Sequence, residues 1–228
     1  MRDTHQKWER RFRNETYPTD PDPSPLLLDC IETAADSERG DGTGNRALDI
    51  ATGTGRNAIP LAEAGYTVDA VDQSRAGLRL ARSRARERDV ADRMNWIQAD
   101  VSTIPFPTSR YALVAISFYR AIDRFSDIKR SLAPGGILFV EHHLRTTDPV
   151  EFGSSDDRFR LASNELLRSC LDLTVLHYEE RTEILEDDRR SAIAEIIARK
   201  SSGDAQSYPH FDRGRGEGDE RTDETDEA

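Results

Sequence analysis

The chain has 228 residues, of which 36% are hydrophobic and 33% charged, and its formal net charge is −11. This length suffices for one domain with a buried core. So acidic a chain is a poor partner for nucleic-acid phosphates or an anionic membrane, and we expect neither. No apolar run approaches the roughly 18 residues of a membrane span, and the polar N-terminus has no signal-peptide core, so we expect a cytoplasmic protein.

The charge is unevenly distributed along the chain. Residues 201–228 contain nine acidic residues and three arginines, so −6 of the net charge lies there. This segment has almost no aliphatic side chains, and we predict an acidic disordered tail. Only Lys7, Lys129 and Lys200 are lysines among the 32 basic residues. An acid-rich, lysine-poor composition resembles that of salt-in halophiles, with arginine-rich codon usage as the alternative, and we expect halophilic adaptation.

The first 25 residues divide into two parts. Residues 4–14 can form a short helix, and YPTDPDPSP then runs as an extended strap, because its four prolines break helices. From residue 26 to 200 the pattern predicts a single α/β domain. It opens with a helix that places Leu26, Leu27, Cys30 and Ile31 on one face.

Strands and helices alternate through this domain. The predicted strands are 47–51, 66–72, 94–100, 111–117, 134–143 and 173–183, and the predicted helices are 56–65, 74–89, 122–133 and 163–172. Ser74 is placed to cap one helix, Ser163 or Asn164 another, and Gly65 to end a third. Residues 189–200 fit a strand or a helix, and their closeness to the preceding strand favours a hairpin. The order predicts a doubly wound, mostly parallel seven-stranded sheet with helices on both faces and an antiparallel last strand.

The first predicted strand ends in the glycine turn Ala51-Thr52-Gly53-Thr54-Gly55. Glycine permits the unusual dihedrals of a tight turn and lets a ligand approach the backbone, and the following helix directs free N–H groups at that ligand. With Ala58 the spacing is G-x-G-x-x-A, which fits NAD. The glycines alone do not choose between NAD and other nucleotides.

Acidic residues follow or punctuate three consecutive strands. Asp72 ends the second strand, where an acid can accept hydrogen bonds from two ribose hydroxyls, in enzymes that use NAD and in enzymes that use S-adenosylmethionine (SAM). The alternative for Asp72 is a helix cap. Asp49 interrupts the first strand, which is normally apolar in NAD sites. Asp100 ends the third strand, where it could accept from an adenine amino group while Val101 flanks the ring. This set favours SAM.

The stretch ALDIATGTGRNAIPLAEAGYTVDAVDQS resembles the opening motifs of class I SAM-dependent methyltransferases. It is most similar to their tellurite-resistance and thiopurine methyltransferase-like branch. The resemblance is supported by four further segments: QADV, YALVAISFY, LAPGGILFVE and the start WERRFR…YPTDPDPSPLL. It covers roughly residues 8–200 and excludes the tail. Two features depart from common patterns: Arg110-Tyr111-Ala112 opens the fourth strand where many members have Phe-Asp, and no N/D-P-P-Y/F motif follows it. The second departure argues against methylation of DNA bases or protein glutamine.

The resemblance implies a methyltransferase that uses SAM and a role for each matching residue. The glycines would approach the methionine part of SAM, Asp72 the ribose, Gln73 the adenosine, and Ser117 the amino acid moiety and methyl. Residues 1–25 would form a lid, in which Arg11 could pair with the SAM carboxylate beside Trp8 and Tyr17. The residues expected to bind the cofactor are Trp8, Arg11, Asp49, Ala51, Gly53, Thr54, Gly55, Asp72, Gln73, Asp100, Val101 and Ser117.

No catalytic dyad is evident, and a soft small-molecule acceptor needs no general base, because the methyl group of SAM is already electrophilic. The weak catalytic candidates are Tyr119, which with Phe118 could flank the sulfonium, and His142 at the end of the fifth strand, where it or His143 could act as a base. Two other functions stay open. An NAD-dependent oxidoreductase is disfavoured by the absence of a Tyr-x-x-x-Lys pair, and a non-catalytic SAM-binding module would keep the same motifs. No metal site is expected.

Overall fold

The structure is a computed structural model that describes residues 2–14, 16–36, 45–154, 156–185, 188–206, 208–209 and 211. In these ranges the helices are α1 (Arg2–Arg13), α2 (Pro25–Asp36), α3 (Ala58–Glu63), α4 (Arg75–Glu87), α5 (Phe125–Ser131) and α6 (Glu165–Arg168). The strands are β1 (Arg46–Ile50), β2 (Thr67–Asp72), β3 (Met94–Gln98), β4 (Tyr111–Ser117), β5 (Leu132–His143), β6 (Thr174–Ile184) and β7 (Arg190–Arg199).

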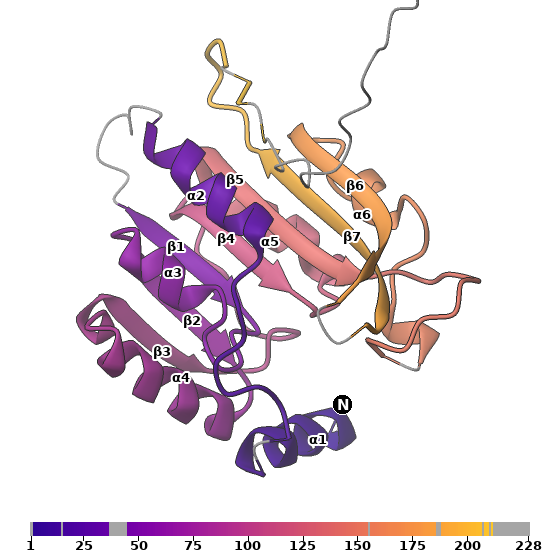
Figure 1. Ribbon diagram of the computed structural model, residues 1–228. Helices are drawn as coiled ribbons and strands as arrows, with labels where there is room; N and C mark the ends of the chain where they lie inside the picture. The colour runs from indigo at the N-terminus through magenta and orange to yellow at the C-terminus, as the bar shows by residue number, and fades with distance from the viewer. Residues whose placement is uncertain are drawn as a thin grey trace, which may run out of the picture.

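The strands form one seven-stranded sheet in the order β3-β2-β1-β4-β5-β7-β6 (Figure 1). Strands β1 to β5 pair in parallel, whereas β7 is antiparallel to both β5 and β6. The predicted sheet with its antiparallel last strand is therefore confirmed. The order reverses between β1 and β4, and ligands of such sheets bind at the carboxyl ends of the strands beside this reversal.

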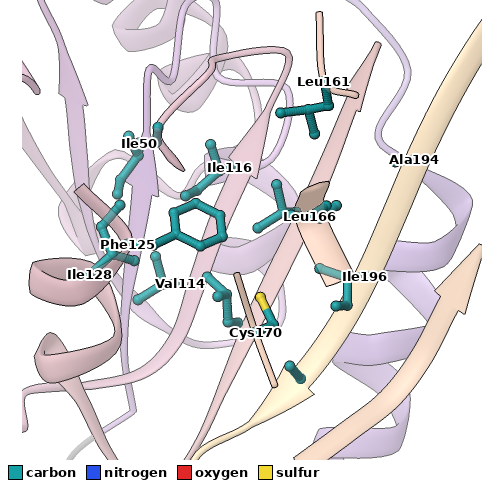
Figure 2. Packing of buried hydrophobic residues seen from close by; sticks show 14 of the residues in the cluster. Ile50, Val114, Ile116, Phe125, Ile128, Leu161, Leu166, Cys170, Ala194 and Ile196 are labelled. Carbon is teal, nitrogen blue, oxygen red and sulfur yellow. The ribbon is translucent and has the colours of Figure 1, made fainter. Parts of the chain in front are cut away.

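Helices cover both faces of the sheet, and each face has its own apolar core. On one face Leu27 of α2 and Leu61 of α3 pack against strand residues such as Phe139. On the other face Phe125 of α5 and Leu166 of α6 pack against the alternate strand residues, as Figure 2 shows. This two-sided burial explains the nearly continuous apolar runs of the central strands.

Several predicted elements have different boundaries in the structure. The helix expected over 163–172 is only the four residues of α6, and Asn164 precedes it with a φ of +58° and no side-chain cap. Instead the carboxylate of Glu165 accepts from the N–H of Ala162 at 2.8 Å. Strand β5 begins two residues earlier than expected, at Leu132, and residues 190–199 are a strand, not a helix. The predicted Ser74 cap is confirmed by its hydrogen bond from the N–H of Gly77.

The acidic tail predicted over 201–228 lies largely outside the described residues, since 212–228 are not among them. Where the chain is described, no helix is long and apolar enough to cross a membrane. The two cysteines, Cys30 and Cys170, are buried and free.

Candidate cofactor and acceptor site

The glycine turn lies where β1 ends, beside the reversal of strand order. Ala51, Gly53 and Gly55 have φ values of +58°, +53° and +86°, a left-handed conformation that side chains disfavour. A Cβ atom on Gly53 would lie 3.3 Å from the ring of Phe12, so the turn is also closely covered. The turn closes through a 2.8 Å hydrogen bond from the N–H of Gly55 to the carbonyl of Thr52.

Asp72 joins the end of β2 to this turn. Its carboxylate accepts from the N–H of Gly53 at 2.8 Å and from the N–H of Ser74 at 2.7 Å. Burial raises the pKa of Asp72, and the two backbone hydrogen bonds oppose that rise. Each carboxylate oxygen has more than one acceptor direction, so these bonds leave capacity for hydroxyl groups of a ligand.

Asp49 lies beneath the turn and is 1% exposed. Its Oδ2 accepts from the hydroxyl of Thr52 at 2.6 Å, and its Oδ1 is buried without a hydrogen-bond partner among the described residues. Burial raises the pKa of Asp49 to about 7, although Thr52, Asn57 and the N–H of Ala58 oppose the rise. A buried carboxylate oxygen with a free lone pair suits a cationic donor.

Polar side chains continue this edge along β4 and β5. Asn57, just before α3, donates to the hydroxyl of Ser117 at 2.8 Å. Arg56 forms an ion pair with Glu141, which is buried, and its guanidinium lies 5.1 Å from the ring centroid of Phe118. Burial raises the pKa of Glu141, and the charge of Arg56 opposes that rise. Ser117 therefore lies within the same polar cluster as the loop that follows β1.

The residues predicted to bind adenine lie after β3. Asp100 is exposed, and its Oδ1 accepts from the N–H and hydroxyl of Ser102 at 2.9 and 2.7 Å, which lowers its pKa. Val101 is 4% exposed and packs in the apolar cluster beneath the edge. Gln73 accepts through its carbonyl from the side chain of Gln98 at 3.3 Å. Of these three, Asp100 is the side chain most open to a ligand.

Helix α1 lies beyond the carboxyl ends of β1 and β2 (Figure 1), against the start of α4. Glu9 accepts from the hydroxyl of Ser74 at 2.6 Å and from the N–H of Ala76 at 3.1 Å. Phe12 covers Gly53 and Gly77. The helix is thus held against the start of α4 by the carboxylate of Glu9 and over the glycine turn by the ring of Phe12.

The predicted lid residues pack with one another on this helix. The ring of Trp8 stacks on Phe12 with centroids 5.7 Å apart and meets the edge of Tyr17 at 5.6 Å. The guanidinium of Arg11 lies 5.0 Å from the centroid of the Trp8 ring. Burial raises the pKa of Tyr17. These aromatic contacts form one layer over the turn.

The extended strap then runs along the turn and is fixed at three points. The hydroxyl of Thr54 donates to the carbonyl of Pro18 at 3.4 Å, and Arg84 of α4 forms an ion pair with Asp20. The Nε of Arg56 donates to the carbonyl of residue 22 at 2.6 Å. The strap is therefore bound to the same loop that carries the glycines.

The two histidines at the end of β5 face opposite sides of the sheet. His143 stacks on Phe118 with ring centroids 4.5 Å apart, on the side of Glu141 and Arg56. His142 is 3% exposed, and its Nδ1 accepts from the N–H of His143 at 2.7 Å. Burial, with the charges of Arg120 and Arg160, lowers the pKa of His142 to about 4. Its proton in the neutral form is then on Nε2, which leaves no lone pair for a general base.

Tyr119, the other catalytic candidate, is partly buried beside the apolar core. Burial raises the pKa of its hydroxyl, and the charges of Asp100 and Asp72 add to the rise. The charges of Asp72, at the end of β2, and Asp100, after β3, thus act on Tyr119, whose hydroxyl stays protonated at neutral pH. In the described ranges, no group of three or more His, Cys, Asp or Glu side chains could hold a metal ion.

Five residues of this region were not among the predicted site residues: Glu9, Phe12, Thr52, Arg56 and Asn57. Thr52 lies within the glycine turn, and Arg56 and Asn57 are the two residues that follow it, so extending the motif by two residues toward the C-terminus would have included them. Glu9 and Phe12 had no local signal. Their contacts with Ser74, Ala76 and Gly53 join distant parts of the chain.

Comparison with known proteins identifies this part of the chain. Residues 47–136 match the family described as "Methyltransferase domain". The ubiquinone/menaquinone biosynthesis C-methyltransferase UbiE of Azotobacter vinelandii is 37% identical over 106 residues, which are 42% of this chain and 42% of that protein. UbiE of Pseudomonas fluorescens is 36% identical over 116 residues, covering 47% and 45%. The chain thus spans less than half the length of the curated relatives it matches.

Solved structures agree on the fold. TehB of Haemophilus influenzae superposes with a TM-score of 0.62 at 20% identity, covering 75% of this chain and 62% of that one. The geranyl diphosphate C-methyltransferase of Streptomyces coelicolor, solved with S-adenosyl-L-homocysteine, gives a TM-score of 0.60 at 16% identity, covering 86% and 98%. At these identities the likeness shows the fold alone. Residues 47–136, with the sheet order and the glycine turn, thus have the character of a class I SAM-dependent methyltransferase domain, as the motifs predicted.

Proposed function

We propose that the protein transfers a methyl group from SAM to a small-molecule acceptor. The observation that carries the proposal is the unit formed by Asp49, the glycine turn and Asp72. It combines a left-handed backbone, a carboxylate bound to that backbone and a second carboxylate with a buried oxygen that has no hydrogen-bond partner in the described ranges. SAM supplies an electrophilic methyl group, and the protein must bind it, orient the acceptor and exclude water.

The residues of this unit fit SAM part by part. Oδ1 of Asp49 would accept from the ammonium of the methionine part, since it is buried and lacks a partner among the described residues. Asp72 would accept from the ribose hydroxyls through its remaining lone pairs. Asp100, with Gln73 and Val101 beside it, would hold the adenine. Ser117 would lie near the methyl group, at the end of β4.

The N-terminal 25 residues would close this site. Phe12 of α1 and Pro18 of the strap already contact the turn, at Gly53 and Thr54, and Glu9 binds the neighbouring start of α4. Trp8 and Arg11 would complete the cover, and Arg11 would pair with the SAM carboxylate. Because the same contacts hold the lid and the turn, cofactor binding and lid position would be coupled.

A small-molecule acceptor is supported by the character of the relatives. UbiE is named for ubiquinone and menaquinone biosynthesis and the Streptomyces enzyme for geranyl diphosphate, and both names specify C-methylation. The chain has no N/D-P-P-Y/F motif after β4, where Ser-Phe-Tyr-Arg stands instead.

Calorimetric titration with SAM, S-adenosylhomocysteine and NAD, in high KCl, separates the candidate functions. A methyltransferase binds the first two and not NAD, whereas an oxidoreductase binds NAD. A non-catalytic module would bind SAM yet release no S-adenosylhomocysteine with any of a panel of quinol, thiol and carboxylic acid acceptors. NAD binding without SAM binding would overturn the proposal.

We also propose that the protein is cytoplasmic and adapted to high salt. The salt adaptation is supported by the net charge of −11 and by the presence of only three lysines in the sequence. Self-repulsion at this charge destabilises a compact state at low ionic strength, and salt screens it. Urea unfolding of the full chain should therefore show stability that rises from low to molar KCl. A midpoint that does not change with KCl would contradict salt adaptation and leave the enzymatic proposal untouched.

A further inference from the structure

At the end of β5 and in the loop after β4 lie two buried donors for which the described part of the chain provides no acceptor. The N–H of His143 must be the donor in its bond to Nδ1 of His142, so neutral His142 carries its proton on Nε2. That Nε2 is buried and has no partner among the described residues. A buried N–H without an acceptor costs free energy, and a native site rarely leaves one unused.

Arg120 supplies the second donor. Its Nη2 binds Glu165, and its Nη1 lies 4.0 Å from Asp123, but its buried Nε has no partner in the described part of the chain. The N–H of Phe118 donates to the carbonyl of Glu141 at 3.0 Å, which holds the loop that carries Arg120 against the end of β5, and the charge of Arg120 acts on the pKa of His142. The unused N–H groups of a histidine and an arginine therefore belong to neighbouring side chains.

Arg160 adds an uncompensated positive charge to the same neighbourhood. It is 6% exposed and donates to the carbonyls of Ser154, Leu144 and Phe152 at 2.6, 2.8 and 3.4 Å. Among the described residues no carboxylate lies within ion-pair distance of it. A buried cation without a counter-ion is costly and favours an anion nearby.

His142 and Arg120 lie at the edge of the sheet where the proposed methyl transfer takes place. Arg120 follows Ser117 by three residues, and His142 is the penultimate residue of β5, so both lie at the carboxyl edge of the sheet. Ser117 in turn accepts a 2.8 Å hydrogen bond from Asn57, which follows the glycine turn. The donors are thus beside the proposed cofactor site and on the side of β5.

We propose that Nε2 of His142 and Nε of Arg120 bind the carboxylate of the methyl acceptor, with Arg160 balancing its charge, so that the substrate is a carboxylic acid. This inference rests on the proposed methyltransferase function and names its substrate class. A carboxylate has two oxygens that only accept, which matches two N–H donors from different elements. His142 is then a donor that positions the acceptor, and not a base. A sealed water molecule is the alternative occupant.

The test uses the full chain saturated with S-adenosylhomocysteine, with benzoate as probe and benzamide as its uncharged counterpart. Nitrogen-15 spectra of the histidine rings should show His142 protonated on Nε2, and benzoate should shift that resonance whereas benzamide should not. A His142 ring protonated on Nδ1 would overturn the proposal. So would a resonance that benzoate leaves unchanged in protein that binds S-adenosylhomocysteine, because a sealed water would then be the occupant.

Variants give a second measurement. Arg120→Met and His142→Phe should weaken benzoate binding by about tenfold or more, the loss expected for a charge-assisted hydrogen bond, and leave S-adenosylhomocysteine affinity unchanged. His142→Gln keeps an N–H near the Nε2 position and should recover part of the loss. Arg158→Met, which removes an exposed arginine, is the matched control and should bind benzoate as the parent does.

Equal benzoate affinity in Arg120→Met, His142→Phe and the parent would overturn the carboxylate site. Should a variant fail to fold, His142→Gln and the histidine resonances of the parent still decide the question. Failure of the parent to bind S-adenosylhomocysteine would instead refute the proposed function. The cofactor titration therefore separates the two failures before benzoate is added.

Discussion

The carboxylate of Asp72 accepts a 2.8 Å hydrogen bond from the N–H of Gly53, which lies 19 residues earlier in the chain. Its other oxygen accepts from the N–H of Ser74, the residue that caps α4. One buried side chain thus connects the glycine turn, the end of β2 and the start of the next helix. The predicted ribose ligand is at the same time a structural element of the turn.

Asp72→Asn should weaken both stability and cofactor affinity. An asparagine keeps one acceptor oxygen and turns an NH₂ group toward a backbone N–H, so one buried donor loses its partner. We expect a loss of about 1–3 kcal/mol in each property. Urea unfolding and S-adenosylhomocysteine calorimetry measure them separately. Asp92→Asn, at an exposed position, is the control, and unchanged affinity in Asp72→Asn would mean that Asp72 does not bind the ribose.

Gly53→Ala and Gly135→Ala form a matched pair, because both glycines have positive φ values, +53° and +75°. An added Cβ meets nothing within 4 Å at Gly135, whereas at Gly53 it would lie 3.3 Å from Phe12. Both variants should lose roughly 1–2 kcal/mol of stability from the left-handed backbone. Only Gly53→Ala should also lose cofactor binding, since its Cβ occupies the approach to the turn. Equal cofactor affinity in the two variants would contradict this placement.

Local sequence signals predicted the strands, the glycine turn and the Ser74 cap, because each depends on neighbouring residues. The length of α6 escaped prediction, although its residues suit a helix. The N–H of Cys170 bonds to the carbonyl of Leu167, three residues earlier, and this tighter turn places the cysteine in the core. Packing against the sheet thus ended a helix that propensity alone would have continued.

The contacts of the candidate site were less accessible from sequence. The bonds from Ser74 to Glu9 and from Arg56 to Glu141 join residues 65 and 85 positions apart. No periodicity encodes such pairs, since they arise only when the sheet brings strand ends and the N-terminal helix together. The orientation of His142 could not be predicted from the sequence either. Alternation along β5 requires the two histidines to point to opposite sides of the sheet, but it does not say which histidine points to which side.

The titration of Asp49 should make cofactor binding depend on pH. Burial raises the pKa of Asp49 to about 7 in the folded state, well above the ordinary range of an aspartate, so between these pH values the folded protein holds a proton that the unfolded chain has lost. Asp49 therefore lowers stability as pH rises from about 4 to about 7, and its effect is constant above 7. An ammonium ligand prefers the ionised form, so SAM affinity should rise over the same range.

Calorimetry at pH 6 in two buffers of different ionisation enthalpy measures this coupling. SAM binding should release about one proton from the parent protein and none from Asp49→Asn. Asp100→Asn is the control, because the pKa of Asp100 is already lowered and its carboxylate is ionised at pH 6. Proton release that persists in Asp49→Asn would assign the titration to another group.

The buried ion pair of Arg56 and Glu141 should show strong coupling between its partners. Arg56→Met leaves Glu141 buried without its cation and also removes the bond to the strap, so we expect a loss of about 3–5 kcal/mol. Pairing it with Glu141→Gln should restore much of that stability, because the uncompensated charge is gone. Urea unfolding of both single variants and the double variant measures the coupling. Additive losses would show that Arg56 acts through the strap and not through Glu141, and the lid would then depend on one hydrogen bond instead of a charge pair.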